Sequence, residues 1–261
     1  MKRNVFRPFL FATLIVLIVG LACSSAAPAT PTATPMPPSD IPTPVPPTST
    51  STPTKIPPTA TATPWPAFFK EEFNTDVLGR WDSFVLKDSA FPNSDKRKSK
   101  VVIENGKLTF TLEDEGLHSH LIYDKQTYDN VRVEISADNR GKNNNFISLI
   151  CRYSNAGWYE FTMMSSGMFQ IWAVDLTGAV HRGYNLIASS GSNAINMGVA
   201  TNVYAIVCSD NQLTLYINGE KATSIPENKY NLTDGKVGIN VSSLNVFPII
   251  VDVEYFDIQE P

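Results

Sequence analysis

The chain has 261 residues, a formal net charge of −4 and a hydrophobic content of 43%. Four of its 21 Lys and Arg and one of its 25 Asp and Glu precede residue 67, which leaves 17 basic and 24 acidic residues after it. The resulting net charge of −7 over residues 67–261 argues against a nucleic acid as the partner.

The N-terminus has the pattern of an export signal. Basic residues at positions 2, 3 and 7 precede an apolar run of 14 residues from Phe9 to Ala22, which ends at Cys23. A membrane-spanning helix needs about 20 residues, so the run has the length of a signal-peptide core. The Gly-Leu-Ala-Cys sequence ending at Cys23 resembles the lipobox of bacterial lipoproteins, although Leu is commonest at its first position. We predict a lipoprotein signal peptide over residues 1–22 and lipidation at Cys23; an ordinary signal peptide cleaved near residue 26 is the alternative.

Residues 24–66 are rich in Pro, Thr, Ser and Ala and contain 14 of the 19 prolines. This composition cannot bury enough apolar surface to offset the entropy lost on ordering. Pro-rich linkers extend by about 3.1 Å per residue, so the segment would reach on the order of 100 Å. We predict that residues 23–66 form a lipid-anchored, disordered linker. It would tether the remainder to the outer face of a membrane, at the cell surface or in the periplasm.

Residues 67–261 have the pattern of short strands separated by polar turns. Asn105-Gly106 and Asn218-Gly219 are hairpin turn signals. The expected strands cover residues 101–103, 108–112, 131–138, 146–153, 158–164, 168–174, 203–208, 213–217, 222–225, 237–241 and 249–258. No stretch shows a sustained helical period, so the pattern predicts an all-β, antiparallel two-sheet sandwich.

Several segments together resemble one family of β-sandwiches. They are Phe69–Asn74 with Trp81, Ile103–Leu108, Leu149–Tyr153, Leu215–Gly219, Val237–Ile239 and Val253–Ile258. The sequence is similar to concanavalin A-like (laminin-G-like jelly-roll) domains over residues 68–259. Its layout looks like the bacterial surface members related to 3-keto-disaccharide hydrolases and family-16-like domains. The resemblance implies a jelly-roll sandwich, and its motifs specify fold rather than function.

Cys151 and Cys208 remain once Cys23 is set aside. An exported chain lies where disulfides persist. Strand alternation places Cys151 on an inward face with Leu149 and Tyr153, and it also places Cys208 inward, on strands that could be neighbours. We predict a Cys151–Cys208 disulfide that closes a 57-residue loop, worth about 4 kcal/mol in the chain-entropy model. Two buried free thiols are the alternative.

One face of the strands between residues 146 and 174 carries side chains that are unusual for a solvent face. Strand alternation places these side chains outward: Arg152, Trp158, Glu160, Gln170 and Trp172. Aromatic rings stack on sugars, and charged or amide groups supply directional hydrogen bonds. The family resemblance also implies a glycan-binding concave sheet. We predict that this face, bordered by His120, binds a glycan or cell-envelope polymer; a satellite core under a covering loop is the alternative.

The search for catalytic groups gives weak candidates. No Ser/His/Asp elbow, phosphate-binding loop or dinucleotide fingerprint appears, and Glu160 and His120 are the weak catalytic candidates. Asp252 and Glu254 share a strand face, at a spacing that can meet the roughly 5–5.5 Å of retaining glycosidases. His118 and His120 also share a face, which suits a transition metal or contact with a ligand; an exposed polar face is the favoured alternative.

The resemblance further implies a structural calcium between the first and last strands. Its candidate ligands are Glu71, Glu72, Asp252 and Asp257, with ordinary edge-strand charge as the alternative. No other cofactor is expected. The favoured interpretation is a surface lipoprotein that presents a monomeric, non-catalytic carbohydrate-binding domain. A glycoside-active enzyme of the 3-keto-disaccharide hydrolase type and a structural or protein-binding envelope module are the alternatives.

Overall fold

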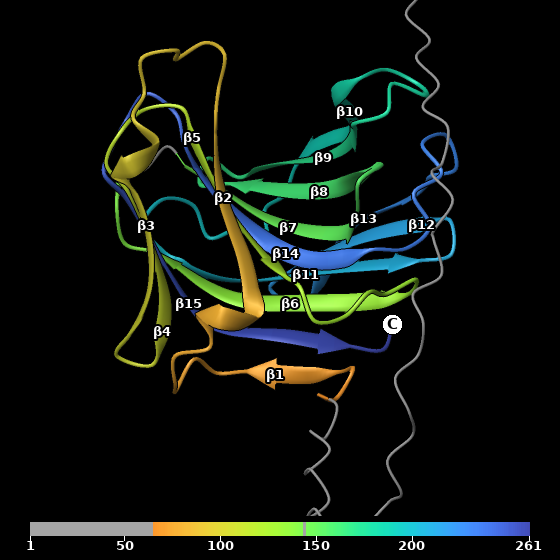
Figure 1. The fold of residues 1–261 in the computed structure, drawn as a ribbon, viewed down its shortest axis with the longest axis horizontal. Coiled ribbons are helices and arrows are strands. Elements are labelled where there is room, and N and C mark those ends of the chain that lie inside the picture. The colour runs from red at the N-terminus through yellow and green to blue at the C-terminus, as the bar shows by residue number, and fades with distance from the viewer. Residues whose placement is uncertain (1–64, 143–144) are drawn as a thin grey trace, which may run out of the picture. The chain divides into compact units, whose positions relative to one another are not determined.

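The computed structural model describes residues 65–142 and 145–261, so the predicted signal peptide, Cys23 and the linker up to residue 64 lie outside the described residues. The described chain forms two antiparallel sheets packed face to face, as predicted (Figure 1). Its helical segments are two short 3-10 turns, Leu78–Arg80 and Lys96–Lys98. Within this part of the chain, no helix is long and apolar enough to cross a membrane.

The first sheet has eight strands in the order β13-β12-β11-β6-β15-β4-β3, and β1 pairs with the C-terminal part of β15. Its strands are β1 (Phe69–Glu71), β3 (Ser99–Glu104), β4 (Lys107–Leu112), β6 (Val131–Asn139), β11 (Thr201–Ser209), β12 (Gln212–Ile217), β13 (Glu220–Pro226) and β15 (Ile249–Gln259). Asn105 and Gly106, both with positive φ, form the predicted turn between β3 and β4.

The second sheet has seven strands in the order β10-β9-β8-β7-β14-β5-β2. They are β2 (Trp81–Lys87), β5 (Leu117–Tyr123), β7 (Asn145–Tyr153), β8 (Gly157–Met164), β9 (Met168–Asp175), β10 (Gly183–Gly191) and β14 (Lys236–Ser243). The edge strands β2 and β10 were not among the expected strands. Both carry many exposed positions, so neither has the clear apolar alternation of the inner strands.

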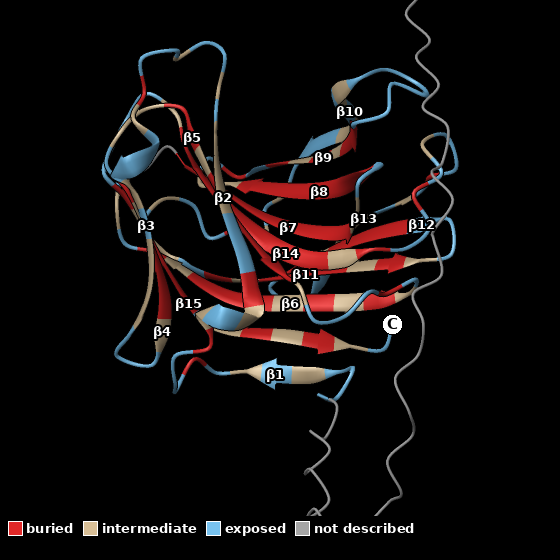
Figure 2. Ribbon diagram, viewed as in Figure 1, coloured by how far each residue is buried: buried red, intermediate tan, exposed pale blue. Residues whose placement is uncertain are grey.

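A single large core fills the space between the sheets. Alternate residues of each inner strand point into it, such as Leu108, Phe110 and Leu112 of β4, which are fully buried. Figure 2 shows the burial concentrated on the inner strands β6, β7, β8 and β14, whereas β1 is exposed or half-buried. The hydrophobic effect of this shared core therefore holds the two sheets together.

The predicted disulfide between Cys151 and Cys208 is present. Both cysteines are fully buried. Their strands, β7 and β11, belong to different sheets and are neighbours across the core, an arrangement that the sequence left open. The bond therefore joins the two layers of the sandwich across the core.

The end of β7 departs from the simple alternation. Arg152 has a positive φ of 54°, and the pairing of β7 with β14 shifts by one residue between Lys236 and Gly238. Such a bulge reverses the faces of the residues after it. Tyr153, predicted to point inward with Cys151, instead packs on the outer side of the sheet, with its ring 5.3 Å from that of Trp158.

Candidate functional site

The strand register of the seven-stranded sheet aligns polar side chains across its outer face. Pairing places one polar residue from each of five adjacent strands in a row: Gln170, Thr162, Ser148, Asn240 and His120. In the next row, Ser242 on β14 is paired with His118 on β5 and with Phe146 on β7. The outer face of this sheet, which strand alternation predicts to be exposed to solvent, therefore has its polar side chains arranged in ordered rows.

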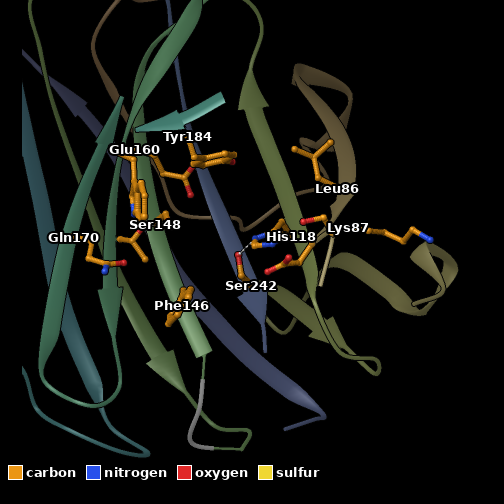
Figure 3. A pocket seen from close by; sticks show the side chains of 13 residues that line it. Leu86, Lys87, His118, Phe146, Ser148, Glu160, Gln170, Tyr184 and Ser242 are labelled. Atoms are coloured by element: carbon orange, nitrogen blue, oxygen red, sulfur yellow. Dashed lines mark hydrogen bonds between the residues drawn. The ribbon is translucent and has the colours of Figure 1, made fainter. Parts of the chain in front are cut away.

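A pocket of about 450 Å³ lies on this face. Its lining residues are Leu86, Lys87, Asp88, Ser89, His118, Phe146, Ser148, Glu160, Thr162, Gln170, Trp172, Tyr184 and Ser242. In Figure 3, Glu160, Ser148 and Gln170 lie on one side, Leu86 lies on the other, and His118 and Ser242 lie between them. The volume falls within the roughly 300–1,000 Å³ of small-molecule sites.

Glu160 is held by donors from three other positions on the sheet. Its Oε2 accepts hydrogen bonds from Nε1 of Trp158 at 3.0 Å and from the hydroxyl of Tyr184 at 3.3 Å. Its Oε1 accepts one from Nδ2 of Asn240 at 2.8 Å. The residue is only 3% exposed, although it contributes to the pocket wall. These three bonds fix the carboxylate in one orientation.

Tyr184 closes one side of the pocket from the edge strand β10. The residue is 46% exposed, while its hydroxyl donates a hydrogen bond to Glu160. Burial around that hydroxyl, together with the charge of Glu160, raises the pKa of Tyr184. The ring lies edge-on to that of Trp172, with 6.1 Å between the centroids. The two aromatic rings therefore form a corner of the pocket.

His118 is the imidazole that lines the pocket. Its Nδ1 lies 2.8 Å from Oγ of Ser242. Burial lowers the pKa of His118, and the nearby carboxylates of Glu160 and Asp88 oppose that shift only in part. Because the ordinary value is near 6.5, the imidazole is neutral at neutral pH.

His120 lies beneath the pocket wall and does not line it. The side chain is fully buried, and its ring stacks on Phe84 with 4.6 Å between centroids. Its Nε2 lies 4.0 Å from Oε2 of Glu160 and has no hydrogen-bond partner among the described residues. Burial lowers the pKa of His120, which the charge of Glu160 opposes. This candidate is therefore a neighbour of Glu160 and has no contact with the pocket space.

The structure brings only three of the six predicted ligand-binding residues to the pocket: Glu160, Gln170 and Trp172. Trp158 is buried in a small cluster on the outer face with Ile122, Ile150 and Val174. The predicted alternative of a satellite core thus describes Trp158, whereas Trp172 lines the pocket.

Arg152 lies away from the pocket and serves a structural role. Its guanidinium donates to three main-chain carbonyls: those of Leu232 at 2.9 Å, Asp129 at 3.1 Å and Asp210 at 2.6 Å. Burial lowers its pKa, which nearby carboxylates oppose. The positive φ at this bulge turns the side chain towards these loops.

Sequence reasoning assigned several pocket residues no binding role. Tyr184 lies on β10, where its alternation with Leu186 is typical of a strand. The Ser and Gly residues that surround the two weaken this strand signal. His118 was considered together with His120 as a metal or ligand contact, and an exposed polar face was favoured over both. Asp88 and Ser242 carried no recognisable signal, because a loop and a distant strand bring them to the site.

The structure does not bring the four calcium candidates together. Glu71 pairs with Arg80 at 3.1 Å, and Asp252 pairs with Arg140 at 2.6 Å. Asp257 lies five residues beyond Asp252 on β15, about 17 Å along an extended strand. Among the described residues, no group of three or more His, Cys, Asp or Glu side chains is placed to hold a metal ion. The His118–His120 pair therefore has no third ligand of these types within the described part of the chain.

The Asp252 and Glu254 pair is also engaged in structural contacts. Asp252 accepts a hydrogen bond from Thr109 at 2.9 Å in addition to its ion pair. Glu254 accepts from Ser136 at 2.8 Å and pairs with Lys107 at 3.4 Å. Both acids belong to the eight-stranded sheet, whereas the pocket lies on the other sheet.

Comparisons with known proteins agree with this fold. A Bacillus subtilis protein of unknown function with a galectin-like fold has a TM-score of 0.56 at 10% identity, and the match covers 75% of this chain and 96% of that protein. A family-16 glycoside hydrolase from Bacteroides ovatus, solved with a glucan product, has a TM-score of 0.54 at 13% identity, and the match covers 73% of this chain and 99% of that protein. A Bacillus licheniformis β-glucanase has a TM-score of 0.51 at 17% identity, and the match covers 75% of this chain and 99% of that protein.

At such identities the structures show a shared fold, the concanavalin A-like jelly roll that the sequence resembles. No curated protein matches this chain. The model of one family, described as the 3-keto-alpha-glucoside-1,2-lyase-like domain, matches residues 69–248 and therefore most of the sandwich. The chain belongs to the 3-keto-alpha-glucoside-1,2-lyase-like domain family.

Proposed function

We propose that the outer-face pocket binds a short saccharide, of one or two sugar rings, on a domain tethered to the cell surface. The observation that carries this proposal is the combination of an aromatic corner, formed by Trp172 and Tyr184, with fixed polar groups around one pocket of about 450 Å³. Aromatic rings accept the apolar faces of sugars, while a few placed polar groups set their orientation.

The polar side chains of the pocket match the hydroxyl groups of a sugar. The hydroxyls of Ser148 and Thr162 lie 3.0 Å apart on the pocket floor, and Gln170 lies beside them in the strand register. Hydroxyl and amide groups both donate and accept hydrogen bonds, as sugar hydroxyls do. The family name and the glucan-hydrolysing proteins of similar fold support a sugar as the ligand.

A second candidate function is cleavage of a 3-keto-glucoside by elimination. It is favoured by the neutral imidazole of His118 in the pocket, together with the family name. A ketone at C3 acidifies the neighbouring C2–H bond, so a modest base can remove that proton. The electron pair then forms a double bond between C1 and C2 as the C1–O bond breaks, and the leaving oxygen takes a proton from water.

The lipoprotein part of the proposal is supported by the N-terminal sequence. The apolar run, Cys23 and the Pro-rich linker have the order expected of a lipid-anchored surface protein. Replacing Cys23 by Ser should release the mature protein from the membrane fraction into the soluble exported fraction. Membrane retention of Cys23→Ser would contradict lipid anchoring at this residue.

Calorimetric titration of the full mature chain tests the binding proposal. Neutral mono- and disaccharides should bind to the wild type, and Trp172→Ala should weaken binding at least tenfold because it removes the stacking ring. Trp65→Ala is the matched control, because Trp65 is 55% exposed and lies outside the pocket. Absence of binding at millimolar sugar, or equal binding by Trp172→Ala, would contradict the proposal.

A further inference from the structure

A chain of hydrogen-bonding groups connects His118 to Glu160 across β5, β14 and β8. Nδ1 of His118 lies 2.8 Å from Oγ of Ser242. Oγ of Ser242 lies 3.3 Å from Oδ1 and 3.1 Å from Nδ2 of Asn240. Nδ2 of Asn240 donates to Oε1 of Glu160 at 2.8 Å. The inner members of this chain are buried, since Asn240 and Ser242 are each 1% exposed.

The donors and acceptors of this chain decide its direction. Ser242 has one hydroxyl proton and two lone pairs. If that proton went to His118, the buried Oδ1 of Asn240 would lose the hydroxyl that donates to it. If the proton goes to Asn240, Oγ of Ser242 can still accept from both Nδ1–H of His118 and the second N–H of Asn240. Only the second arrangement satisfies every buried group of the chain.

The satisfied arrangement places the ring proton of neutral His118 on Nδ1. Three hydrogen bonds then run in one direction: from Nδ1–H of His118 to Ser242, from Ser242 to Oδ1 of Asn240, and from Nδ2 of Asn240 to the carboxylate of Glu160. The second N–H of Asn240 donates back to Oγ of Ser242. Bonds aligned in this way polarise one another and favour positive charge at the imidazole end. The other ring nitrogen, Nε2, keeps its lone pair on a side chain that lines the pocket.

We propose that Nε2 of His118 is the proton acceptor of the pocket and that Ser242 and Asn240 are positioning residues that fix its tautomer. This inference rests on the elimination activity proposed above. In the reaction, Nε2 takes the proton from C2 of the 3-keto-glucoside, the electron pair forms the C1=C2 bond, and the C1–O bond breaks. The leaving oxygen takes its proton from water. Glu160 acts at the far end of the chain, as the anion that stabilises the imidazolium.

Three other charged or titratable groups surround His118. Asp88 lies on the loop after β2, and its charge acts on the imidazole together with that of Glu160. His120 lies two residues along β5, and its Nδ1 contacts the main-chain oxygen of His118 at 3.3 Å. Lys87 points away from the pocket and donates to the carbonyl of Pro92 at 2.7 Å (Figure 3). Among the described residues that line the pocket, no positively charged group therefore points towards His118 and disfavours its protonation.

The tautomer is measured directly by two-bond ¹H–¹⁵N NMR correlation of His118 in the full mature chain at pH 8. The expected result is a protonated Nδ1 and an unprotonated Nε2. Ser242→Ala should abolish this preference, whereas Ser242→Thr keeps the hydroxyl and should restore it. A protonated Nε2 in the wild type would overturn the inference, whatever the activity.

Kinetics with a 3-keto-α-glucoside test the catalytic part. We expect His118→Asn to lower kcat about 10²–10⁴-fold, the usual contribution of a general base. Ser242→Ala should lower kcat about tenfold with little change in KM, and Ser242→Thr should recover most of it. The control is Ser189→Ala, an exposed hydroxyl on β10 outside the pocket.

The outcomes separate this inference from the function on which it rests. Turnover by the wild type with an unchanged kcat in His118→Asn or Ser242→Ala would overturn the inference and leave the elimination activity standing. Absence of turnover by the folded wild type would overturn the elimination activity and, with it, the catalytic role of His118. Turnover together with the Nδ1–H tautomer and the two losses of kcat would support both.

Discussion

Removing the Cys151–Cys208 disulfide should destabilise the domain strongly. The bond joins two residues 57 positions apart and connects the two sheets across the core. The chain-entropy model gives about 4 kcal/mol for a loop of this length, because the cross-link restricts the unfolded chain. A domain of this size loses about 2–4 °C in Tm for each kcal/mol. The expected decrease in Tm is therefore about 8–16 °C.

Two forms of the protein test this magnitude. Reduction of the wild type breaks the bond, removes no atom from the core and adds one hydrogen to each sulfur. The double variant Cys151→Ala/Cys208→Ala also removes two buried sulfur atoms, so it should melt somewhat below the reduced wild type. Circular dichroism melts with and without reductant give both values, and peptide mapping verifies the state of the bond.

The reasoning is refuted if the verified loss of the bond changes Tm by less than about 2 °C. Such a result would mean that the unfolded chain is already restricted without the cross-link. A larger decrease in the reduced wild type than in the double variant would also contradict it, because the variant loses both the bond and the packing. The melting temperature of the double variant should not respond to reductant.

The remaining predictions concern backbone, buried charge and pH. Gly157→Ala should cost about 3 kcal/mol in denaturant unfolding, because a Cβ there would lie 1.8 Å from the carbonyl oxygen of Val174 at a φ of +145°; Gly79→Ala, with open space around it, is the control. Arg152→Ala should cost about 3 kcal/mol by leaving three carbonyls without their donor, and an unchanged midpoint would contradict its structural role. The free energy of unfolding should fall as the pH drops below about 6.5, because the folded state holds His120 neutral with a lowered pKa while the unfolded state takes up the proton. His120→Asn should reduce this slope between pH 7 and 5, and His118, whose pKa burial also lowers, should supply part of the slope that remains. An equal slope in the variant would contradict the assignment.

The fold was predictable because its signals are local. Alternation along β7, β8 and β9 identified the buried face, and the Asn-Gly turns marked two hairpins. The same alternation also placed Glu160, Gln170 and Trp172 on one face, where they line the pocket. These residues lie on regular strands, so a period of two suffices to orient them.

The rest of the site depends on contacts that no local pattern encodes. The bulge at Arg152 gives a positive φ to a residue that rarely adopts it, and it reverses the faces of Arg152 and Tyr153 relative to plain alternation. Tyr184 reaches Glu160 from an edge strand 24 residues away. Ser242 and His118 meet only because β14 pairs with β5, across 124 residues of sequence. Long-range register, set by the whole core, decides these contacts.

The central claim is that a saccharide occupies the pocket on the outer face of the seven-stranded sheet. The most direct measurement is NMR titration of the isotope-labelled mature chain with neutral mono- and disaccharides. The account predicts saturable shifts at the indole N–H of Trp172, the side-chain amide of Gln170 and the ring of Tyr184. Shifts confined to the eight-stranded sheet, or none at tens of millimolar sugar, would contradict it.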